Sequence, residues 1–227
     1  MFLPSRYRPP SLPVLVLAAV LVTSCSVSSP QERTVSVAAA GCGDGYDTTV
    51  AGAVVDRDLV VTVAHGVAQA DAIVVGRQGL TFGATVVVLD LRSDLALLSV
   101  PGIGGDEIVA GRTASGEAVT IVGGLASGDL DAVVTRTATI RIEEVLGTDR
   151  VERAGIELSA RARVGDSGAG VFDDEGALVG VVFAVNDDGS DVVWATAASE
   201  VTDLFHAPRA RWGCDPSRSR LAPVDQP

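Results

Sequence analysis

The sequence predicts an all-β protein whose strands form one globular domain. Short runs rich in Val, Ile and Leu recur along the chain, and clusters of Gly, Asp and Asn separate them. β-branched residues favour strands, and many short strands with frequent turn signals are typical of a barrel or a sandwich. The segment from Cys42 to Cys214 has the length of a single compact domain.

The predicted strands follow one another without long helical segments between them. They span residues 50–55, 59–63, 72–76, 84–89, 95–100, 118–122, 132–140, 155–158, 170–172, 178–185 and 191–196. Near the end of the domain, Val201, Leu204 and Phe205 are spaced at i, i+3 and i+4 behind Ser199. That spacing predicts a short closing helix with the serine as its N-cap.

The first residues of the chain have the features of an export signal. Arg6 and Arg8 precede an apolar stretch, residues 12–22, that is too short to span a bilayer. The stretch ends in Val22-Thr23-Ser24-Cys25, which resembles the bacterial lipobox, in which the cysteine becomes the first mature residue and carries lipid such as palmitate. This pattern predicts a signal peptide over residues 1–24 and an exported protein anchored by lipid on Cys25 to the outer face of the bacterial cell membrane. The alternative is an ordinary cleaved signal with a coincidental cysteine.

The flanks of the globular domain have a different composition. Residues 25–41, rich in Ser, Val and Ala, are interpreted as a tether, and residues 215–227, which contain several prolines, as a disordered tail. The domain itself is expected to span residues 42–214.

Cysteine parity predicts one disulfide. Of the three cysteines, lipidation would use Cys25 and leave Cys42 and Cys214 as an even pair in an oxidising compartment. The alternative is two free thiols. No Cys/His cluster with metal-ligand spacing exists in the sequence, so we expect neither a metal nor another cofactor.

The charge of the chain argues against some partners. The 29 acidic residues outnumber the 17 basic ones, every one of which is arginine, and the net charge is −12. Such acidity argues against nucleic-acid binding and against electrostatic docking on anionic lipid. We interpret it as a solubility feature.

Three residues carry the most specific chemical signal. A serine hydroxyl is a poor nucleophile at neutral pH, and it needs a base within hydrogen-bond reach and an acid that orients this base. Ser167 lies in Gly165-Asp166-Ser167-Gly168, His65 follows a long apolar run, and Asp94 lies between them in sequence. Taken alone, each residue could have a purely structural role. The order His, Asp, Ser along the chain, however, is that of the chymotrypsin class. The other histidine, His206, is expected to be structural or exposed.

The segments around these residues resemble bacterial trypsin-like serine proteases. Residues 50–65 end in Thr62-Val63-Ala64-His65, residues 91–98 contain Asp94-Leu95-Ala96-Leu97, and residues 164–170 precede the apolar strand 178–183. The similarity covers roughly residues 49–204 and is closest to Deg/Htr-type and related single-domain proteases. We expect no PDZ domain, because too few residues follow Cys214.

The resemblance implies a fold and a set of roles. The fold would be two packed six-stranded β-barrels with a short C-terminal helix, and the catalytic site would lie between the barrels. Ser167 would be the nucleophile, His65 the general base and acid, and Asp94 the orienting carboxylate. The backbone N–H groups of Gly165 and Ser167 would form the oxyanion hole.

Two residues of the serine loop depart from the resembled pattern. Ala169 replaces the usual second glycine, and its methyl group is expected to crowd the loop or the cleft. Asp166 corresponds to the residue that pairs with a new apolar N-terminus in digestive relatives, and no such start exists in this sequence. We therefore expect Asp166 to face solvent or to have another partner, for which the candidates are Arg136, Arg141, Arg161 and Arg163.

The resemblance also suggests residues of a substrate pocket. Its wall would include Phe183, Ala184 and Val185, and Arg161 would occupy the position where trypsin-like specificity needs a carboxylate. We therefore expect a small or medium apolar residue at the cleaved position. An inward Arg161 that selects an acidic residue is the alternative.

The predicted function is that of a lipid-anchored serine endopeptidase that acts on protein or peptide substrates through an acyl-enzyme. A non-catalytic binding protein on the same fold is the alternative, and an esterase is disfavoured by the order of the triad. The sequence does not indicate an oligomeric state.

Overall fold

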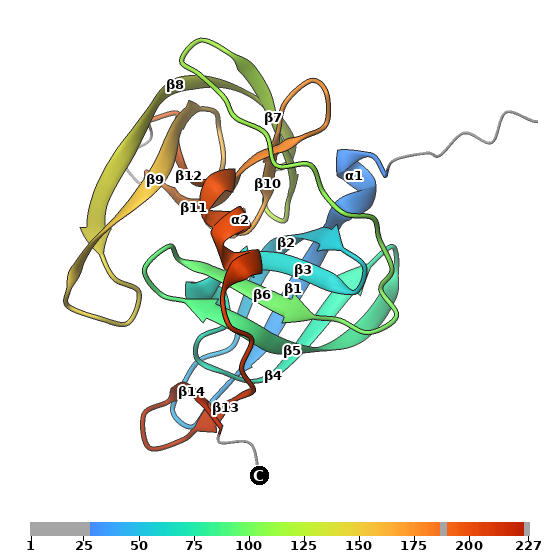
Figure 1. The fold of residues 1–227 in the computed structure, drawn as a ribbon, viewed down its shortest axis with the longest axis vertical. Helices are drawn as coiled ribbons and strands as arrows, with labels where there is room; N and C mark the ends of the chain where they lie inside the picture. The colour runs from blue at the N-terminus through green and yellow to red at the C-terminus, as the bar shows by residue number, and fades with distance from the viewer. Residues whose placement is uncertain (1–27, 187–189, 225–227) are drawn as a thin grey trace, which may run out of the picture.

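Two closed β-barrels, packed side by side, form the body of the protein (Figure 1). The structure is a computed structural model, and it describes residues 28–186 and 190–224. The predicted signal peptide and Cys25 therefore lie outside the described residues. Within the described part, no helix is long and apolar enough to cross a membrane.

Barrel one is formed by the first six strands, in the order β1-β2-β3-β6-β5-β4. Pairing of β1 with β4 closes it. The strands are β1 (Thr34–Gly41), β2 (Thr48–Asp56), β3 (Leu59–Val63), β4 (Ala70–Arg77), β5 (Leu80–Asp90) and β6 (Leu95–Ser99). All six pair antiparallel, so short turns suffice to connect most of them.

Barrel two repeats this arrangement with the order β10-β11-β12-β9-β8-β7, and β10 pairs with β7 to close it. Its strands are β7 (Ala118–Gly124), β8 (Gly128–Glu143), β9 (Arg150–Ser159), β10 (Gly170–Phe172), β11 (Leu178–Val185) and β12 (Val192–Ala197). The two-barrel, all-β fold that the sequence and the resemblance predicted is confirmed. All of the predicted strands are present, and most extend further by a few residues.

Strands at the junction of the barrels are buried on both faces. β2 and β11 are apolar along most of their length, without the alternation of a half-exposed strand. Ala51 of β2 belongs to the apolar core of barrel two, whereas Phe172 and Val181 of barrel two belong to that of barrel one. Such an interlocked core fixes the position of each barrel relative to the other.

The N-terminal boundary of the domain was predicted incorrectly. Residues 25–41 were interpreted as a tether, but Pro30–Arg33 forms the short helix α1 and β1 is an integral strand of barrel one. Val35, Val37 and Ala39 alternate inward and are buried. The alternation is concealed in the sequence because the outward residues are Ser and Ala rather than charged side chains.

The C-terminal boundary differs as well. The predicted tail, residues 215–227, includes β14 (Arg220–Pro223), which forms a hairpin with β13 (Trp212–Asp215), and Leu221 is buried. A disulfide joins Cys42 to Cys214, the pairing that cysteine parity predicted. The hairpin thus lies against the end of barrel one (Figure 1), because the bridge holds it beside the loop that follows β1.

The closing helix α2 (Ala198–His206) lies across the junction of the barrels, with Val201 and Leu204 buried (Figure 1). The predicted cap was wrong by two residues, since the N-cap is Ala197 and no side chain caps the helix. His206 is exposed, and its Nδ1 lies 2.8 Å from the Thr202 carbonyl.

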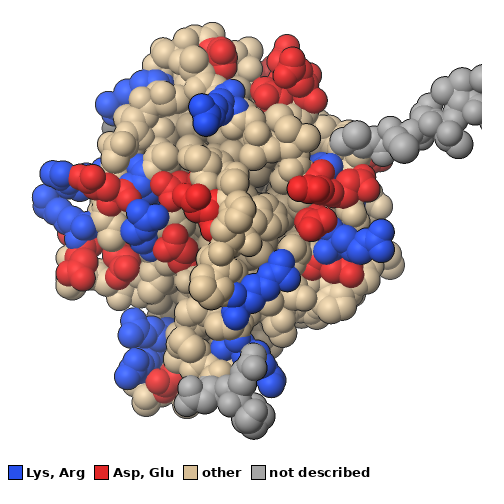
Figure 2. Space-filling view, in the orientation of Figure 1, with Lys and Arg blue, Asp and Glu red and all other residues tan. Residues whose placement is uncertain are grey.

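Charged residues of both signs are interspersed over the surface (Figure 2). On the long β8–β9 hairpin, Arg136 pairs with Glu157 at 2.7 Å, and Arg141 pairs with Glu152. Such exposed pairs contribute little to stability, commonly less than about 1 kcal/mol each.

Candidate active site

The structure brings His65 and Asp94 together at the end of barrel one. His65 lies in the 3₁₀ turn Ala64–Gly66 directly after β3, and Asp94 lies in the loop between β5 and β6. The Nδ1 of His65 is 2.8 Å from Oδ2 of Asp94, and the His65 backbone N–H donates to Oδ1 at 2.9 Å. Two bonds to the same carboxylate fix both the position and the orientation of the imidazole ring.

The backbone around Asp94 supports this pairing. The Asp94 carbonyl accepts the N–H of Ala64 at 3.0 Å, so the loop is bonded to the histidine turn at a third point. Asp94 adopts a left-handed conformation, with φ +56°, which Asp tolerates better than most residues. From barrel two, the hydroxyl of Thr196 donates to the Ser93 carbonyl at 3.1 Å, so that β12 holds the same loop.

Ser167 comes from barrel two and lies in the loop before β10. The loop is bonded directly to barrel one, because the Ser167 carbonyl accepts the N–H of Ala51 at 2.8 Å. The Ala51 carbonyl in turn accepts the hydroxyl of Thr62 at 2.6 Å. Since Thr62 precedes His65 by three residues, these bonds hold the serine loop beside the strand that carries the histidine.

Gly168 makes this close approach possible. Its φ is +91°, and a Cβ at this position would lie 1.9 Å from the Ala51 carbonyl oxygen. Only a residue without a side chain fits against β2 at this point. The next residue, Ala169, is fully buried in the core of barrel two. The methyl group of Ala169 therefore fills the core and does not crowd the cleft as expected.

The Ser167 hydroxyl is not bonded to His65 in this structure. It donates to the Phe183 carbonyl at 3.3 Å, and no hydrogen bond to the histidine is present in the described part of the chain. The hydroxyl would have to leave the Phe183 carbonyl before it could donate to His65. Hydrogen bonds of this kind often tighten only when substrate is bound.

Two backbone donors flank the serine. Gly165 has φ +104°, a conformation that favours glycine. Among the described residues, the N–H groups of Gly165 and Ser167 have no protein acceptor. N–H groups without a protein acceptor are what stabilisation of a developing oxyanion requires.

Asp166 is fully buried, and none of the arginines predicted as its partners supplies a side chain to it. Its Oδ1 accepts the backbone N–H groups of Ala126 and Ser127 at 2.8 and 3.0 Å, and its Oδ2 accepts the N–H of Arg163 at 2.8 Å. The carboxylate therefore bonds the serine loop to the turn between β7 and β8. Several backbone N–H bonds satisfy a buried carboxylate without a cation.

The predicted pocket residues are only partly where they were expected. The side chain of Arg161 is 85% exposed and lies 3.4 Å from Asp191, so the inward Arg161 that was considered is not what the structure shows. The Phe183 side chain is buried in the core, and its backbone carbonyl faces Ser167. Ala184 and Val185 are half-buried. Val164, three residues before the serine, is a strongly exposed apolar side chain.

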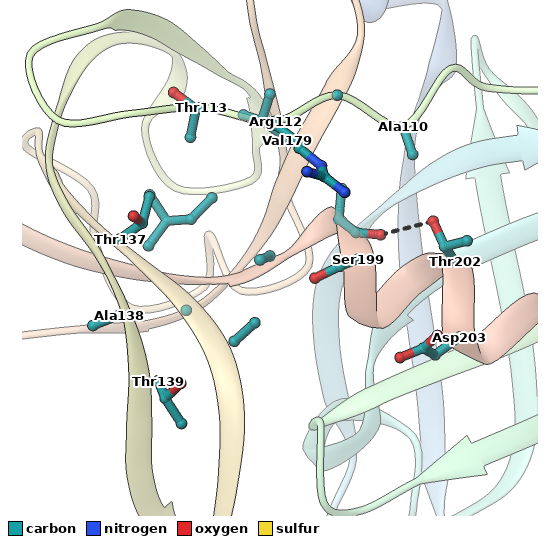
Figure 3. Close-up of a pocket in the computed structure, with 16 residues that line it drawn as sticks. Ala110, Arg112, Thr113, Thr137, Ala138, Thr139, Val179, Ser199, Thr202 and Asp203 are labelled. Atoms are coloured by element: carbon teal, nitrogen blue, oxygen red, sulfur yellow. Dashed lines mark hydrogen bonds between the residues drawn. The ribbon is translucent and has the colours of Figure 1, made fainter.

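A separate cavity of about 690 Å³ opens beside the N-terminal end of α2 (Figure 3). Its polar lining includes Arg112 from the segment between the barrels and Thr137 and Thr139 from β8, and the helix contributes Ser199, Thr202 and Asp203. The Thr202 hydroxyl is already bonded to the Ala198 carbonyl. No triad residue lines this cavity. In the described residues, no group of His, Cys, Asp and Glu side chains is arranged to hold a metal ion.

The paired barrels, with the His65–Asp94 pair on the barrel to which the Ser167 loop is bonded, define the class of a trypsin-like serine protease. The comparison with protein families agrees, since residues 50–181 match the trypsin-like peptidase domain. The chain therefore belongs to the trypsin-like peptidase family.

Individual relatives and solved structures support the same assignment. The chain is 30% identical over 202 residues to the serine proteases Rv3671c and MT3772 of two Mycobacterium tuberculosis strains. That match covers 86% of this chain, which spans about half, 50%, of those relatives. The crystal structure of the active form of Rv3671c protease aligns with a TM-score of 0.73 and 26% identity, over 91% of this chain and 93% of the other. The inactive form aligns with a TM-score of 0.67 at 24% identity, over 78% and 89%, which shows the shared fold.

Proposed function

We propose that this chain is a serine endopeptidase that cleaves protein or peptide substrates through an acyl-enzyme. The observation that carries the proposal is the pair of bonds between His65 and Asp94, at 2.8 and 2.9 Å, next to a serine loop bonded to the same barrel. His65 then takes the Ser167 proton as the hydroxyl attacks the carbonyl, and it gives that proton to the leaving amine. Water attacks the acyl-enzyme in the second half of the reaction.

The oxyanion hole belongs to the same proposal. The N–H groups of Gly165 and Ser167 would receive the negative charge that develops on the carbonyl oxygen, and one such donor is commonly worth about 3–4 kcal/mol of barrier. Their lack of protein acceptors supports this role.

The substrate preference we propose is a small or medium apolar residue at the cleaved position. The Ser167 hydroxyl is bonded to the Phe183 carbonyl, at the start of the apolar strand end Phe183-Ala184-Val185. Arg161 stays at the surface in its pair with Asp191, so no charged side chain from that position reaches the predicted pocket. A peptide-library profile dominated by cleavage after Arg, Lys or acidic residues would contradict this preference.

Lipid anchoring on Cys25 is a further part of the proposal. Its support is the lipobox-like Val22-Thr23-Ser24-Cys25 and the described fold, which begins only a few residues later with α1. The tether would then be short, and the domain would be held close to the outer face of the membrane. Mass spectrometry of the purified mature protein should find a lipidated N-terminal cysteine, and an unmodified N-terminus at another residue would refute it.

Hydrolysis of a peptide library by the purified protein tests the catalytic proposal. Wild type should cleave, Ser167→Ala should not, and Asp94→Asn should lower kcat on the order of 10⁴-fold because it favours the wrong tautomer of His65. Circular dichroism should show that both variants keep the fold. Binding of peptides without cleavage by wild type would favour a non-catalytic binding protein. That alternative has some support, because the Ser167 hydroxyl is bonded to the Phe183 carbonyl instead of to His65.

A further inference from the structure

The first described residues, 28–34, form an N-terminal segment that is bonded to barrel one and to the linker between the barrels. Arg33 of α1 is buried, and its Nη1 donates to the carbonyl of Asp106, in the linker, at 2.8 Å. Arg77, the last residue of β4, donates from Nε and Nη2 to the Glu32 carbonyl at 3.0 and 2.6 Å. Hydrogen bonds from a charged donor are the stronger kind. They fix α1 at the junction of the barrels (Figure 1).

The N-terminal segment also contacts barrel two, at the 123–128 turn that joins β7 to β8. Gly123 has φ +76°, and a Cβ at this position would lie 1.8 Å from Cγ2 of Thr34, so only a residue without a side chain fits there. The Gly123 N–H donates to Oδ1 of Asp129 at 2.8 Å, and Oδ2 of that carboxylate accepts a long bond of 3.4 Å from the Gln31 side chain. Thr34 and Asp129 therefore both hold the backbone of Gly123.

Strand pairing does not fix this part of the turn. The register of β7 and β8 shifts between Ile121 and Gly124, and Gly123 has no partner in β8 or in β10. Its N–H is bonded to a side chain instead, that of Asp129. The position of Gly123 is therefore set by side-chain contacts, and the closest of them comes from Thr34 of barrel one.

The same turn contacts the serine loop through the next residues of the chain. A Cβ on Gly124 would lie 2.6 Å from Oδ1 of Asp166. That oxygen accepts the N–H groups of Ala126 and Ser127 at 2.8 and 3.0 Å. A Cβ on Gly165 would in turn lie 3.6 Å from that of Ala126. A shift of the turn would therefore move the partners of the buried carboxylate beside the proposed nucleophile.

We propose that Thr34 and Asp129 are positioning residues for the reaction: they hold the 123–128 turn where its N–H groups bind Asp166, and so they order the oxyanion donors on either side of that aspartate. The proposal rests on the proposed function, because only there do these donors receive charge. Oxyanion donors act on the transition state and need placement to within about 0.5 Å. Loss of the contacts should therefore lower kcat more than it changes KM.

Gly123→Ala and Gly128→Ala form a matched pair of variants within the turn. Their φ angles are +76° and +75°, so the backbone strain is the same, but nothing lies within 4 Å of a Cβ at residue 128. Only Gly123→Ala pushes the turn away from Thr34. The double variant Gly123→Ala/Thr34→Gly removes the obstructing side chain and should recover most of what Gly123→Ala loses.

Amide hydrogen exchange of Ala126 and Ser127, followed by NMR, measures the effect without relying on activity. Their N–H groups are bonded to Asp166, so exchange reports how well the turn holds that carboxylate. It should be about tenfold faster or more in Gly123→Ala than in Gly128→Ala. Val60 serves as the reference, because it is buried in β3 and paired on both sides. A general loss of stability would accelerate its exchange as well, whereas a displaced turn would not.

Asp129→Ala tests the second contact without adding bulk. Exchange of the two amides should rise about two- to tenfold, the range expected for the loss of one hydrogen bond. Asp129→Asn keeps an acceptor oxygen for the Gly123 N–H and should stay close to wild type. Asp131→Ala is the control for the lost charge, because Asp131 is an exposed carboxylate of the same strand, and its side chain has no bond to another described residue.

The outcomes separate the inference from the function on which it rests. Equal exchange in Gly123→Ala and Gly128→Ala, together with wild-type exchange in Asp129→Ala, would overturn the inference. Should Gly123→Ala fail to fold, the comparison of Asp129→Ala with Asp129→Asn and Asp131→Ala still decides the matter. In an active protein, kcat should fall in the variants whose exchange accelerates, and an unchanged kcat would refute the positioning role. If exchange accelerates as expected but wild type shows no hydrolysis, the coupling of the turn to Asp166 stands and the proposed function fails.

Discussion

The Asp166 carboxylate accepts the backbone N–H of Ala126 at 2.8 Å, and this bond holds the serine loop against the turn between β7 and β8. Together with the bonds from Ser127 and Arg163, it leaves the carboxylate satisfied without any cation. The loop that carries Ser167 is therefore ordered by contacts within the folded domain.

Asp166→Asn should disrupt this arrangement, because the amide presents an N–H₂ group to backbone donors. Unpaired buried donors commonly cost about 1–3 kcal/mol each. We expect a lower melting temperature and a larger effect on kcat than on KM, since the proposed oxyanion donors adjoin Asp166.

Asp173→Asn is the control for that variant, because Asp173 also accepts two backbone N–H bonds, from Glu175 and Ala177, but in a surface turn. It should lower stability slightly and leave kcat unchanged. Equal kcat for Asp166→Asn and wild type would show that the carboxylate does not order the loop.

Gly168→Ala should destabilise the protein far more than Gly116→Ala. Both glycines have φ +91°, so the backbone strain of the substitution is the same, about 1–3 kcal/mol. A Cβ at residue 168 would collide with the Ala51 carbonyl, however, whereas nothing lies within 4 Å of one at residue 116. Chemical denaturation of both variants measures the difference, and similar losses of stability would contradict the close packing of the serine loop on β2.

The sequence pointed to His65, Asp94 and Ser167 because each lies in a short local motif, and the structure bonds the first two of them to each other. It also predicted the strands well where they are buried on both faces, since β2, β3 and β11 are continuous apolar runs. It failed for β1, whose outward side chains are small and whose strand status depends on pairing with β2 and β4. The partners of Asp166 could not be found from side-chain types, because they are backbone N–H groups, two of them in a distant turn.

Loss of the Cys42–Cys214 disulfide should lower stability by a few kcal/mol. The bridge closes a loop of sequence separation 172, which restricts the unfolded chain strongly in loop-entropy models. The Cys42→Ser/Cys214→Ser double variant, compared with wild type by urea denaturation, measures the effect. Peptide mapping without reduction should find the linked peptides, and free thiols at both positions would contradict the bridge.

Glu157→Gln should make the stability of the protein less dependent on acid pH. A hydrogen bond from Thr135, and then the bond and charge of Arg136, lower the pKa of Glu157 below its usual 4.5. A carboxyl group with a lowered pKa in the folded state contributes stability above its unfolded pKa, and this contribution is lost as the pH falls through the folded value. Melting temperatures between neutral and acidic pH should therefore fall less steeply in the variant, and identical slopes would contradict the predicted linkage.

Covalent labelling of Ser167 tests the central claim most directly. A fluorophosphonate reacts only where a base activates the serine hydroxyl and an oxyanion hole stabilises the negative charge that develops in the reaction. The account predicts that purified wild type gains the mass of one adduct on the peptide containing Ser167, that Ser167→Ala gains none, and that Asp94→Asn reacts much more slowly. A folded wild-type protein that remains unlabelled, or that is labelled equally well after Ser167→Ala, would contradict it.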